Sequence, residues 1–255
     1  SSLLLNKPEH ATVVGGGFIG LEMVEALHHR GIKVTLLELS DQVMAPVDRE
    51  MANMLHQKLV EKGVDLRLNT GLAAVTELEI QPAEPEATGE YDKQIEHTNT
   101  LELMLSTGEM LKTGLVVLAI GVKPETMLAN QAGIELGARG GIKVDARMCT
   151  SDPDIFAVGD VVETEDFVTA LPSLVPLAGP ANRQGRIAAD NMLGRREIYR
   201  RTQGTSICKL FDMAIGSTGL NEKTLKRLKL PYEKIYVHTY IVQLFCKMCF
   251  FQFPF

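Results

Sequence analysis

The chain has 255 residues, 45% hydrophobic and 23% charged, with a formal net charge of −6. This composition is typical of a globular protein of one or two domains. The acidic balance argues against nucleic acid as a partner, and the sequence contains no apolar run of the roughly 18 residues that a membrane-spanning helix needs, so no membrane partner is expected. Four cysteines are too few for a disulfide scaffold in a chain this long, and we expect a cytoplasmic protein.

The first part of the chain alternates apolar runs with segments of helical spacing. Three apolar runs predict β-strands at residues 11–14, 33–38 and 64–68. Two segments between them predict helices at residues 21–29 and 49–62, the second capped by Asp48. This order is a βαβαβ unit, whose strands are expected to be parallel.

Shorter elements follow. Further strands are predicted at residues 72–80, 101–106, 109–112 and 115–120, and residues 81–100 are polar and resemble a surface loop. The strand at 109–112 is expected to complete an antiparallel addition to the parallel sheet. The later elements expected are a strand at 154–158, a helix at 179–193 and a strand near 206–211.

The turn Gly15–Gly20 fits G-x-G-x-x-G between a predicted strand and a predicted helix. The first glycine permits a tight turn, the second lets the backbone approach a pyrophosphate, and the third lets helix and strand pack closely. Free amides at the start of the helix bind the anion. Glycine-rich turns are common, so the specificity of the signal comes from the strand and helix that flank it.

A carboxylate follows at the end of the second predicted strand. Glu38 lies 18 residues after Gly20, where an acidic side chain accepts hydrogen bonds from the ribose hydroxyls of an adenosine. Its charge repels a 2′-phosphate, and residues 39–41 offer no cation to hold one, so NAD is favoured over NADP. The alternative is a turn used only for packing, with an incidental surface glutamate.

A second signal is the apolar run Asp154–Val158, which ends in Gly159-Asp160. Ligands of open α/β sheets bind at the carboxyl ends of strands, and a carboxylate there suits a polyol chain. The alternative interpretation is a turn residue that caps the following segment.

Four ordered motifs together resemble the pyridine nucleotide-disulfide oxidoreductase family, in particular its coenzyme A disulfide reductase and NADH oxidase branch. They are Gly15–Gly20, Ala119–Pro124, Asp154–Asp160 and Pro176–Gly185. The resemblance implies an α/β fold in which a Rossmann-like NAD-binding domain, residues 8–120, is inserted in an FAD/NAD(P)-binding fold. Residues 121–196 would be the C-terminal part of the FAD-binding domain, and 197–239 the start of an α+β dimerisation domain. The apolar tail 240–255 does not match.

The resemblance also implies FAD and NAD as cofactors, with NADH preferred over NADPH. The positions that it assigns to NAD are Gly15, Gly17, Ile19, Gly20 and Glu38, with Gly121 beside the nicotinamide. Phe18 matches an aromatic residue that covers the flavin until nicotinamide displaces it. The positions that it assigns to FAD are Gly159, Asp160, Leu177 and Ala178, and Asn182 is a candidate contact for a coenzyme A-type substrate.

The sequence also departs from the family pattern. Members begin with their own FAD-binding turn and a helix with a redox-active cysteine, whereas the first turn here matches their NAD-binding turn. We therefore expect that on the order of 100–150 residues precede this segment in a complete protein, and we assign no catalytic cysteine. The six histidines form no metal-binding set, and the Cys246-x-x-Cys249 spacing is interpreted as coincidence.

The function expected is that of a fragment of an FAD-dependent NAD(P)H oxidoreductase. Hydride would pass from NADH to flavin and on to a small-molecule disulfide such as coenzyme A disulfide, or to oxygen, in a homodimeric parent. One alternative is a flavin-free dehydrogenase, although no tyrosine is followed by lysine four positions on. The other is a catalytically inactive truncated isoform that binds NAD or pairs with an intact subunit.

Overall fold

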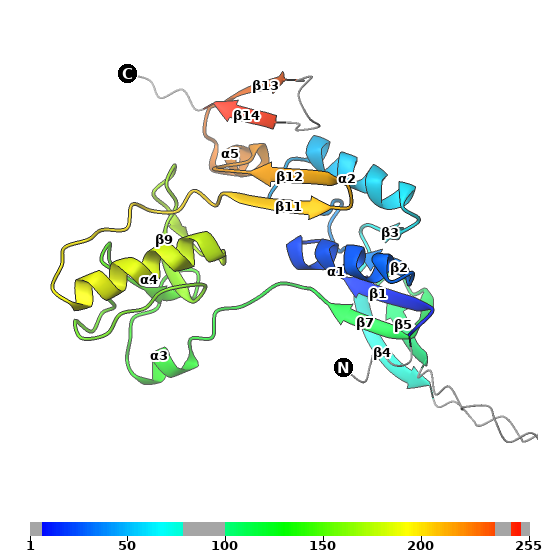
Figure 1. The fold of residues 1–255 in the computed structure, drawn as a ribbon, viewed down its shortest axis with the longest axis horizontal. Coiled ribbons are helices and arrows are strands. Elements are labelled where there is room, and N and C mark those ends of the chain that lie inside the picture. Colours follow the sequence, from blue (N-terminus) through cyan, green and yellow to red (C-terminus); the bar gives the residue numbers. More distant parts are fainter. Residues whose placement is uncertain (1–6, 79–99, 238–245, 251–255) are drawn as a thin grey trace, which may run out of the picture. The chain divides into compact units, whose positions relative to one another are not determined.

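The computed structural model describes residues 7–78, 100–237 and 246–250 (Figure 1). Two compact units are present. The first comprises Ser1–Gly121 and Cys208–Ile215, and the second comprises Val122–Ile207, Gly216–His238 and Cys246–Phe255, as far as the described residues reach. Cys208, Leu210 and Phe211 are buried in the core of the first unit, although they fall within the segment 197–239 expected for dimerisation. The expected domain boundaries stay predictions.

A four-stranded parallel sheet forms the centre of the first unit, in the order β3-β2-β1-β7. The strands are β1 (His10–Val14), β2 (Lys33–Leu37), β3 (Asp65–Arg67) and β7 (Leu115–Leu118). β1 is central, pairing with β2 on one side and β7 on the other. Short apolar runs buried on both faces form such strands, and the predicted βαβαβ order is confirmed.

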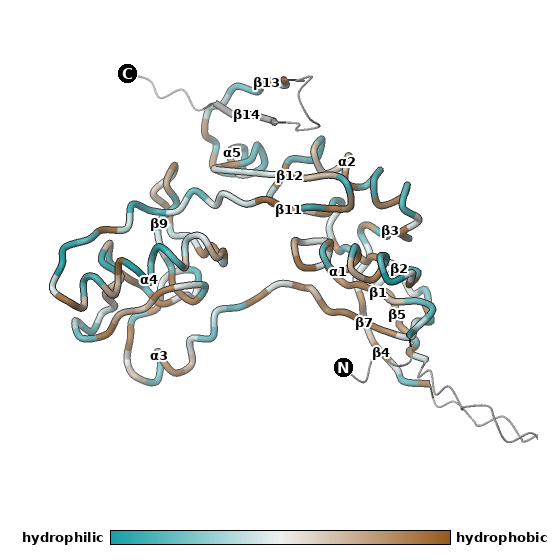
Figure 2. The backbone as a smooth tube through the Cα atoms, in the orientation of Figure 1, coloured by the Kyte–Doolittle hydropathy of each residue, from teal (hydrophilic) through white to brown (hydrophobic). Residues whose placement is uncertain are grey.

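Two helices, α1 (Phe18–His29) and α2 (Arg49–Glu61), bury their apolar sides in one core with the sheet (Figure 1). Much of α2 is hydrophilic, whereas β7 is hydrophobic throughout (Figure 2). Each helix is followed by a glycine with positive φ, +70° at Gly31 and +77° at Gly63, a conformation common just after a helix end. Asp48 is the N-cap residue of α2, but within the described part of the chain its side chain makes no capping hydrogen bond, so that detail of the prediction is wrong.

The opposite face of the parallel sheet is covered by three antiparallel strands in the order β4-β5-β6. They are β4 (Leu72–Leu78), β5 (Thr100–Leu105) and β6 (Met110–Thr113). The expected antiparallel addition is present, completed by β6, and it packs on a face of the parallel sheet as a separate sheet. Leu103 and Leu105 are buried against Val14 and Leu37, so the alternate side chains of β1 and β2 are covered by this second layer.

The second unit has shorter elements. A small sheet has the order β10-β9-β8, and β13 pairs with β14. β11 pairs with β12, but most of this pair, Cys208–Ile215, belongs to the first unit. The strands are β8 (Ile142–Lys143), β9 (Val162–Glu165), β10 (Pro172–Ser173), β11 (Ser206–Leu210), β12 (Met213–Ser217), β13 (Glu233–Val237) and β14 (Cys246–Phe250). The helices are α3 (Met127–Gln131), α4 (Ala178–Met192) and α5 (Glu222–Leu228). The bounds of α4 agree with the predicted helix to one residue.

The strand predicted at 154–158 is wrong. Among the described residues, this run contributes only an isolated bridge between Phe156 and Cys149. Ile155 and Val158 are 42% and 36% exposed, so the run lacks the burial that its apolar sequence suggested. The buried cluster of this unit is small and contains Met148, Ala188 and Tyr199.

Candidate nucleotide site

The turn Gly15–Gly20 lies at the carboxyl end of the central strand β1 and leads directly into α1. Gly15 has a φ of +106°, and a Cβ there would lie 2.3 Å from the carbonyl oxygen of Ala119. A Cβ at Gly20 would lie 1.8 Å from the carbonyl oxygen of Gly15. Both separations are far below van der Waals contact, so the first and last glycines hold strand, turn and helix together.

Gly17 differs from these two glycines. It is the N-cap residue of α1, with an ordinary extended conformation (φ −79°), and no described atom lies within 4 Å of a Cβ built on it. The first residues of a helix have amides without intrahelical acceptors, and the first amide of α1 with such an acceptor belongs to Leu21, which donates to Gly17. The open space at Gly17 and these amides form a surface suited to an anion.

Glu38 follows β2 at the same edge of the sheet, partly buried. Its two carboxylate oxygens accept backbone hydrogen bonds, Oε2 from the amide of Gly16 at 2.7 Å and Oε1 from the amide of Ser40 at 2.7 Å. Sequence reasoning predicted the carboxylate but missed both amides, since nothing in a sequence marks which backbone donors a side chain meets. Each oxygen keeps a second lone pair for a ligand hydroxyl.

The remaining positions expected at the NAD site differ in exposure. Ile19 is 55% exposed, whereas Phe18 is partly buried against the core of the first unit. Gly121, three residues beyond β7, has a φ of +101°. Arg49, the first residue of α2, forms an ion pair with Asp41, which lies three residues beyond Glu38 in the chain. The structure thus brings together Gly15, Gly17, Gly20 and Glu38.

The residues expected at the flavin lie in the second unit. Gly159, with a φ of +89°, donates its amide to the buried side chain of Gln184 at 2.8 Å, and Asp160 beside it is exposed. Leu177 is the N-cap residue of α4 and Ala178 its first residue. Gln184 is therefore a positioning residue to which the sequence had assigned no role.

Asn182, expected to touch substrate, donates its side-chain amide to the carbonyl oxygen of Ala178 within α4 at 2.8 Å. This bond occupies one of its two amide hydrogens. The side chain is exposed, so its oxygen and second hydrogen stay open to solvent.

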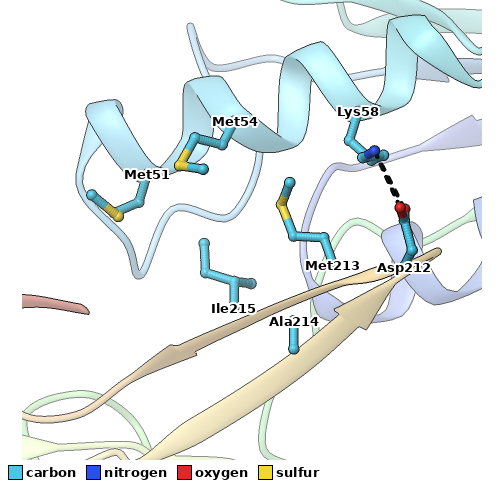
Figure 3. A pocket seen from close by; sticks show the side chains of 7 residues that line it. All are labelled: Met51, Met54, Lys58, Asp212, Met213, Ala214 and Ile215. Atoms are coloured by element: carbon cyan, nitrogen blue, oxygen red, sulfur yellow. Dashed lines mark hydrogen bonds and ion pairs between the residues drawn. The ribbon is translucent and has the colours of Figure 1, made fainter. Parts of the chain in front are cut away.

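A separate groove of about 120 Å³ lies in the first unit between α2 and β12 (Figure 3). Met51, Met54 and Met213 line it, and Lys58 contacts Asp212 at its end with an N–O distance of 3.3 Å. Hydrogen bonds to Glu61, and then to Asp212, raise the pKa of the Lys58 ammonium. None of the residues expected to bind nucleotide is among the described residues that line this groove.

Cys149 and Cys208 are not activated nucleophiles. Burial raises the pKa of the Cys208 thiol to about 11, with Glu22 and Glu25 adding to the effect. Burial also raises the pKa of Cys149. In the described part of the chain, no three His, Cys, Asp or Glu side chains gather as a metal site would require. None of its helices combines the length and apolar character needed to cross a bilayer.

Comparison with known proteins identifies relatives of this site and fold. The family model described as pyridine nucleotide-disulphide oxidoreductase matches residues 2–185. An NAD(P)H coenzyme A polysulfide/persulfide reductase of Pyrococcus horikoshii is 33% identical over 228 residues, which are 89% of this chain and 46% of that protein. An NADH oxidase of Methanocaldococcus jannaschii is 31% identical, with 89% of this chain and 46% of that protein covered.

Solved structures show the same similarity. Reduced CoADR-RHD of Bacillus anthracis superposes with a TM-score of 0.79 at 46% identity, covering 91% of this chain and 38% of that one. The water-forming NADH oxidase of Lactobacillus brevis, solved with NADH, has a TM-score of 0.79 at 30% identity, covering 92% and 48%. The chain thus spans less than half the length of these relatives, and the predicted α/β fold class is confirmed. The chain belongs to the pyridine nucleotide-disulphide oxidoreductase family.

Proposed function

We propose that the chain binds NADH at the turn Gly15–Gly20 and serves, with FAD, in an NAD(P)H-dependent oxidoreductase. Hydride passes from NADH to the flavin, and the electrons pass on to a small-molecule disulfide such as coenzyme A disulfide, or to oxygen. The observation that carries the proposal is the placement of Glu38 beside the turn, with its carboxylate hydrogen-bonded to Gly16. The relatives include an NAD(P)H coenzyme A polysulfide/persulfide reductase, coenzyme A disulfide reductases and NADH oxidases.

The turn can hold a pyrophosphate without rearrangement. Gly17 leaves open space where the backbone meets the ligand, and the first amides of α1 point from the positive end of the helix. The first turn of α1, Phe18–Leu21, contains no acidic side chain that would oppose the phosphates. Ile19 is exposed on this turn and supplies a backbone amide to the site.

The preference for NADH over NADPH rests on charge. In the proposed complex the Glu38 carboxylate accepts hydrogen bonds from the adenosine ribose and repels a 2′-phosphate. The guanidinium of Arg49 is paired with Asp41, three residues beyond Glu38 in the chain. A 2′-phosphate would have to compete with Asp41 for that cation while facing Glu38.

The second unit fits part of a flavin site. FAD, when bound, supplies the hydride acceptor. Asp160 would hold the ribityl and phosphate region, on a turn that Gly159 and Gln184 fix by a 2.8 Å hydrogen bond. The start of α4 at Leu177 and Ala178 would face the pyrimidine edge of the flavin, and Phe18 would cover its ring. Asn182 keeps polar atoms free for a coenzyme A-type substrate.

We also propose that the complete protein is a homodimer in the cytoplasm.

Titration of the full chain with NADH and NADPH, followed by calorimetry and thermal melting, tests the proposal. We expect tighter binding of NADH, and a loss of that preference in Glu38→Gln. Glutamine keeps only one of the two oxygens that accept backbone amides, so the substitution can also affect folding. The melting midpoint of each variant is therefore measured. Glu61→Gln, an exposed helical carboxylate elsewhere in the unit, is the matched control. A folded chain whose heat signal and melting midpoint do not respond to NADH refutes the proposal.

Flavin binding is tested separately. FAD is added to the purified chain, and its absorbance is followed before and after NADH is supplied. Because this chain holds only part of the flavin site, we expect weak FAD binding, weakened further by Asp160→Asn. Reduction of bound flavin by NADH supports the oxidoreductase function, whereas NADH binding without flavin binding favours a chain that only binds nucleotide.

A further inference from the structure

The second unit contains a cavity of about 360 Å³ that the proposed function does not use. Its walls are Phe167, the side of α4 at Gly179, Pro180 and Arg183, and residues 199–205. None of the described residues expected to bind flavin or substrate lines it. Its volume is within the range of small-molecule sites in proteins.

The cavity is strongly basic. Arg183, Arg200 and Arg201 line it, and of the described residues in its walls none is acidic. Arg201 forms an ion pair with Glu165 at 2.8 Å, in which both side chains are about half exposed and so weakly coupled. Arg183 and Arg200 form no ion pair with any described residue. Guanidinium groups bind phosphate oxygens through paired hydrogen bonds, so this set favours a phosphorylated ligand.

The wall formed by residues 199–205, which carries Arg200 and Arg201, is fixed by hydrogen bonds to neighbouring segments. The hydroxyls of Tyr199 and Thr202, both buried, are 2.6 Å apart. The backbone of Thr202 bonds to Glu165 and Phe167, at 3.1 Å and 2.9 Å. Arg200 and Arg201 thus project from a segment that is anchored on both sides, and less conformational freedom is lost when a ligand binds.

An aromatic ring completes the cavity. Phe167 is 49% exposed, although a ring of this size is usually buried. The loop that carries it is fixed because the Asp166 carboxylate accepts hydrogen bonds from the amides of Val168 and Thr169, at 3.0 Å and 2.8 Å. An exposed ring beside guanidinium groups is the combination on which proteins stack a nucleobase.

We propose that this cavity is a second nucleotide site, specific for a nucleoside diphosphate. Arg183 and Arg200 bind the phosphates, and the base stacks on Phe167. The site is independent of the turn Gly15–Gly20, which lies in the other unit.

Calorimetric titration of the full chain with ADP tests the proposal, because ADP can occupy both sites. We expect two bound ADP in the unchanged chain, and one each in Gly17→Ala and in the double variant Arg183→Gln with Arg200→Gln. The double variant should weaken the second site by about 30-fold or more, since hydrogen bonds to charged groups are the strong ones. Replacing the exposed arginines 195 and 196 by glutamine is the control, and should leave both sites intact.

A second comparison tests the base. Phe167→Leu should weaken ADP at the second site by about tenfold, the loss expected for one stacked base, and leave inorganic pyrophosphate unchanged. The proposal is overturned if Gly17→Ala abolishes all ADP binding, or if the control double variant loses as much affinity as the cavity variant. If the turn does not bind nucleotide at all, one ADP still binds and is lost only in the cavity variant, so the two proposals fail separately.

Discussion

Gly20→Ala should lower the stability of the chain, whereas Gly17→Ala should lower its affinity for NADH, although both glycines belong to one motif. A Cβ at Gly20 meets the Gly15 carbonyl oxygen at 1.8 Å, and ordinary carbon–oxygen contact needs more than 3 Å. Neither partner can rotate away, because both atoms are backbone. Helix α1 and the turn must therefore move apart by more than about 1 Å to reach ordinary contact distance.

The expected cost follows from this separation. Overpacking of a core costs about 1–3 kcal/mol, and a backbone neighbour places Gly20→Ala at the upper end. For a chain of this size about 1 kcal/mol lowers the melting midpoint by about 2–4 °C, so a cost of about 3 kcal/mol predicts a drop of about 6–12 °C. Gly17→Ala meets open space at an ordinary φ, so its stability should change by less than about 1 kcal/mol.

NADH affinity, in contrast to stability, should be lost in Gly17→Ala. The methyl group of Gly17→Ala fills the space proposed for the pyrophosphate, and the loss of even one hydrogen bond to a charged group weakens NADH about tenfold or more. Melting by circular dichroism and calorimetric NADH titration of the same samples give both quantities. The reasoning is refuted if Gly20→Ala melts with the unchanged chain, or if Gly17→Ala binds NADH with full affinity.

Three further results are expected. Thr12 is buried in the central strand and its hydroxyl has no partner among the described residues, so Thr12→Val should stabilise the chain by about 1 kcal/mol in denaturant titration; destabilisation contradicts this. Burial lowers the pKa of His56 below its ordinary 6.5, and its Nε2 accepts from the amide of Val43 at 3.1 Å. The folded chain therefore binds fewer protons than the unfolded chain below about pH 6.5, so the free energy of unfolding should fall as the solution is acidified. The fall should be shallower in His56→Gln, and equal slopes would exclude His56 as the source. Native alkylation with iodoacetamide, mapped by mass spectrometry, should modify Cys149 before Cys208, whose pKa burial raises to about 11; equal rates would contradict the buried placement.

The sequence predicts the parallel sheet well for a physical reason. Strands buried on both faces must be apolar throughout, and the helices between them must show apolar residues three or four apart. The antiparallel addition was predicted without the layer that it covers, because alternation along Thr100–Leu105 shows that one face is buried, but not against which layer. The run at 154–158 is apolar without the burial of a strand, and composition alone does not reveal the missing neighbour.

The site shows the same division between local and distant information. The glycines of the turn are predictable because their conformations and close contacts are set within one strand and one helix. The link between Gly159 and Gln184, 25 residues apart, depends on how α4 packs. The basic cavity is similar, because Arg183 and Arg200 belong to separate segments that only the fold brings into one wall.

Glu38 is predictable from the sequence, but its hydrogen bonds to the backbone are not, and these bonds limit how the cofactor preference can change. Its carboxylate already holds the amides of Gly16 and Ser40, so in the proposed complex the ribose meets an acceptor that is oriented before it arrives. A substitution that removes the negative charge also leaves at least one of these amides without its acceptor, next to the pyrophosphate. Acceptance of a 2′-phosphate would further require a cation beside it, and the Arg49 guanidinium is paired with Asp41 through side chains that are more than half exposed, so this pair is weak. Removing Glu38 therefore weakens NADH before it favours NADPH, and a switch of preference needs a second change that places a cation against the 2′-phosphate.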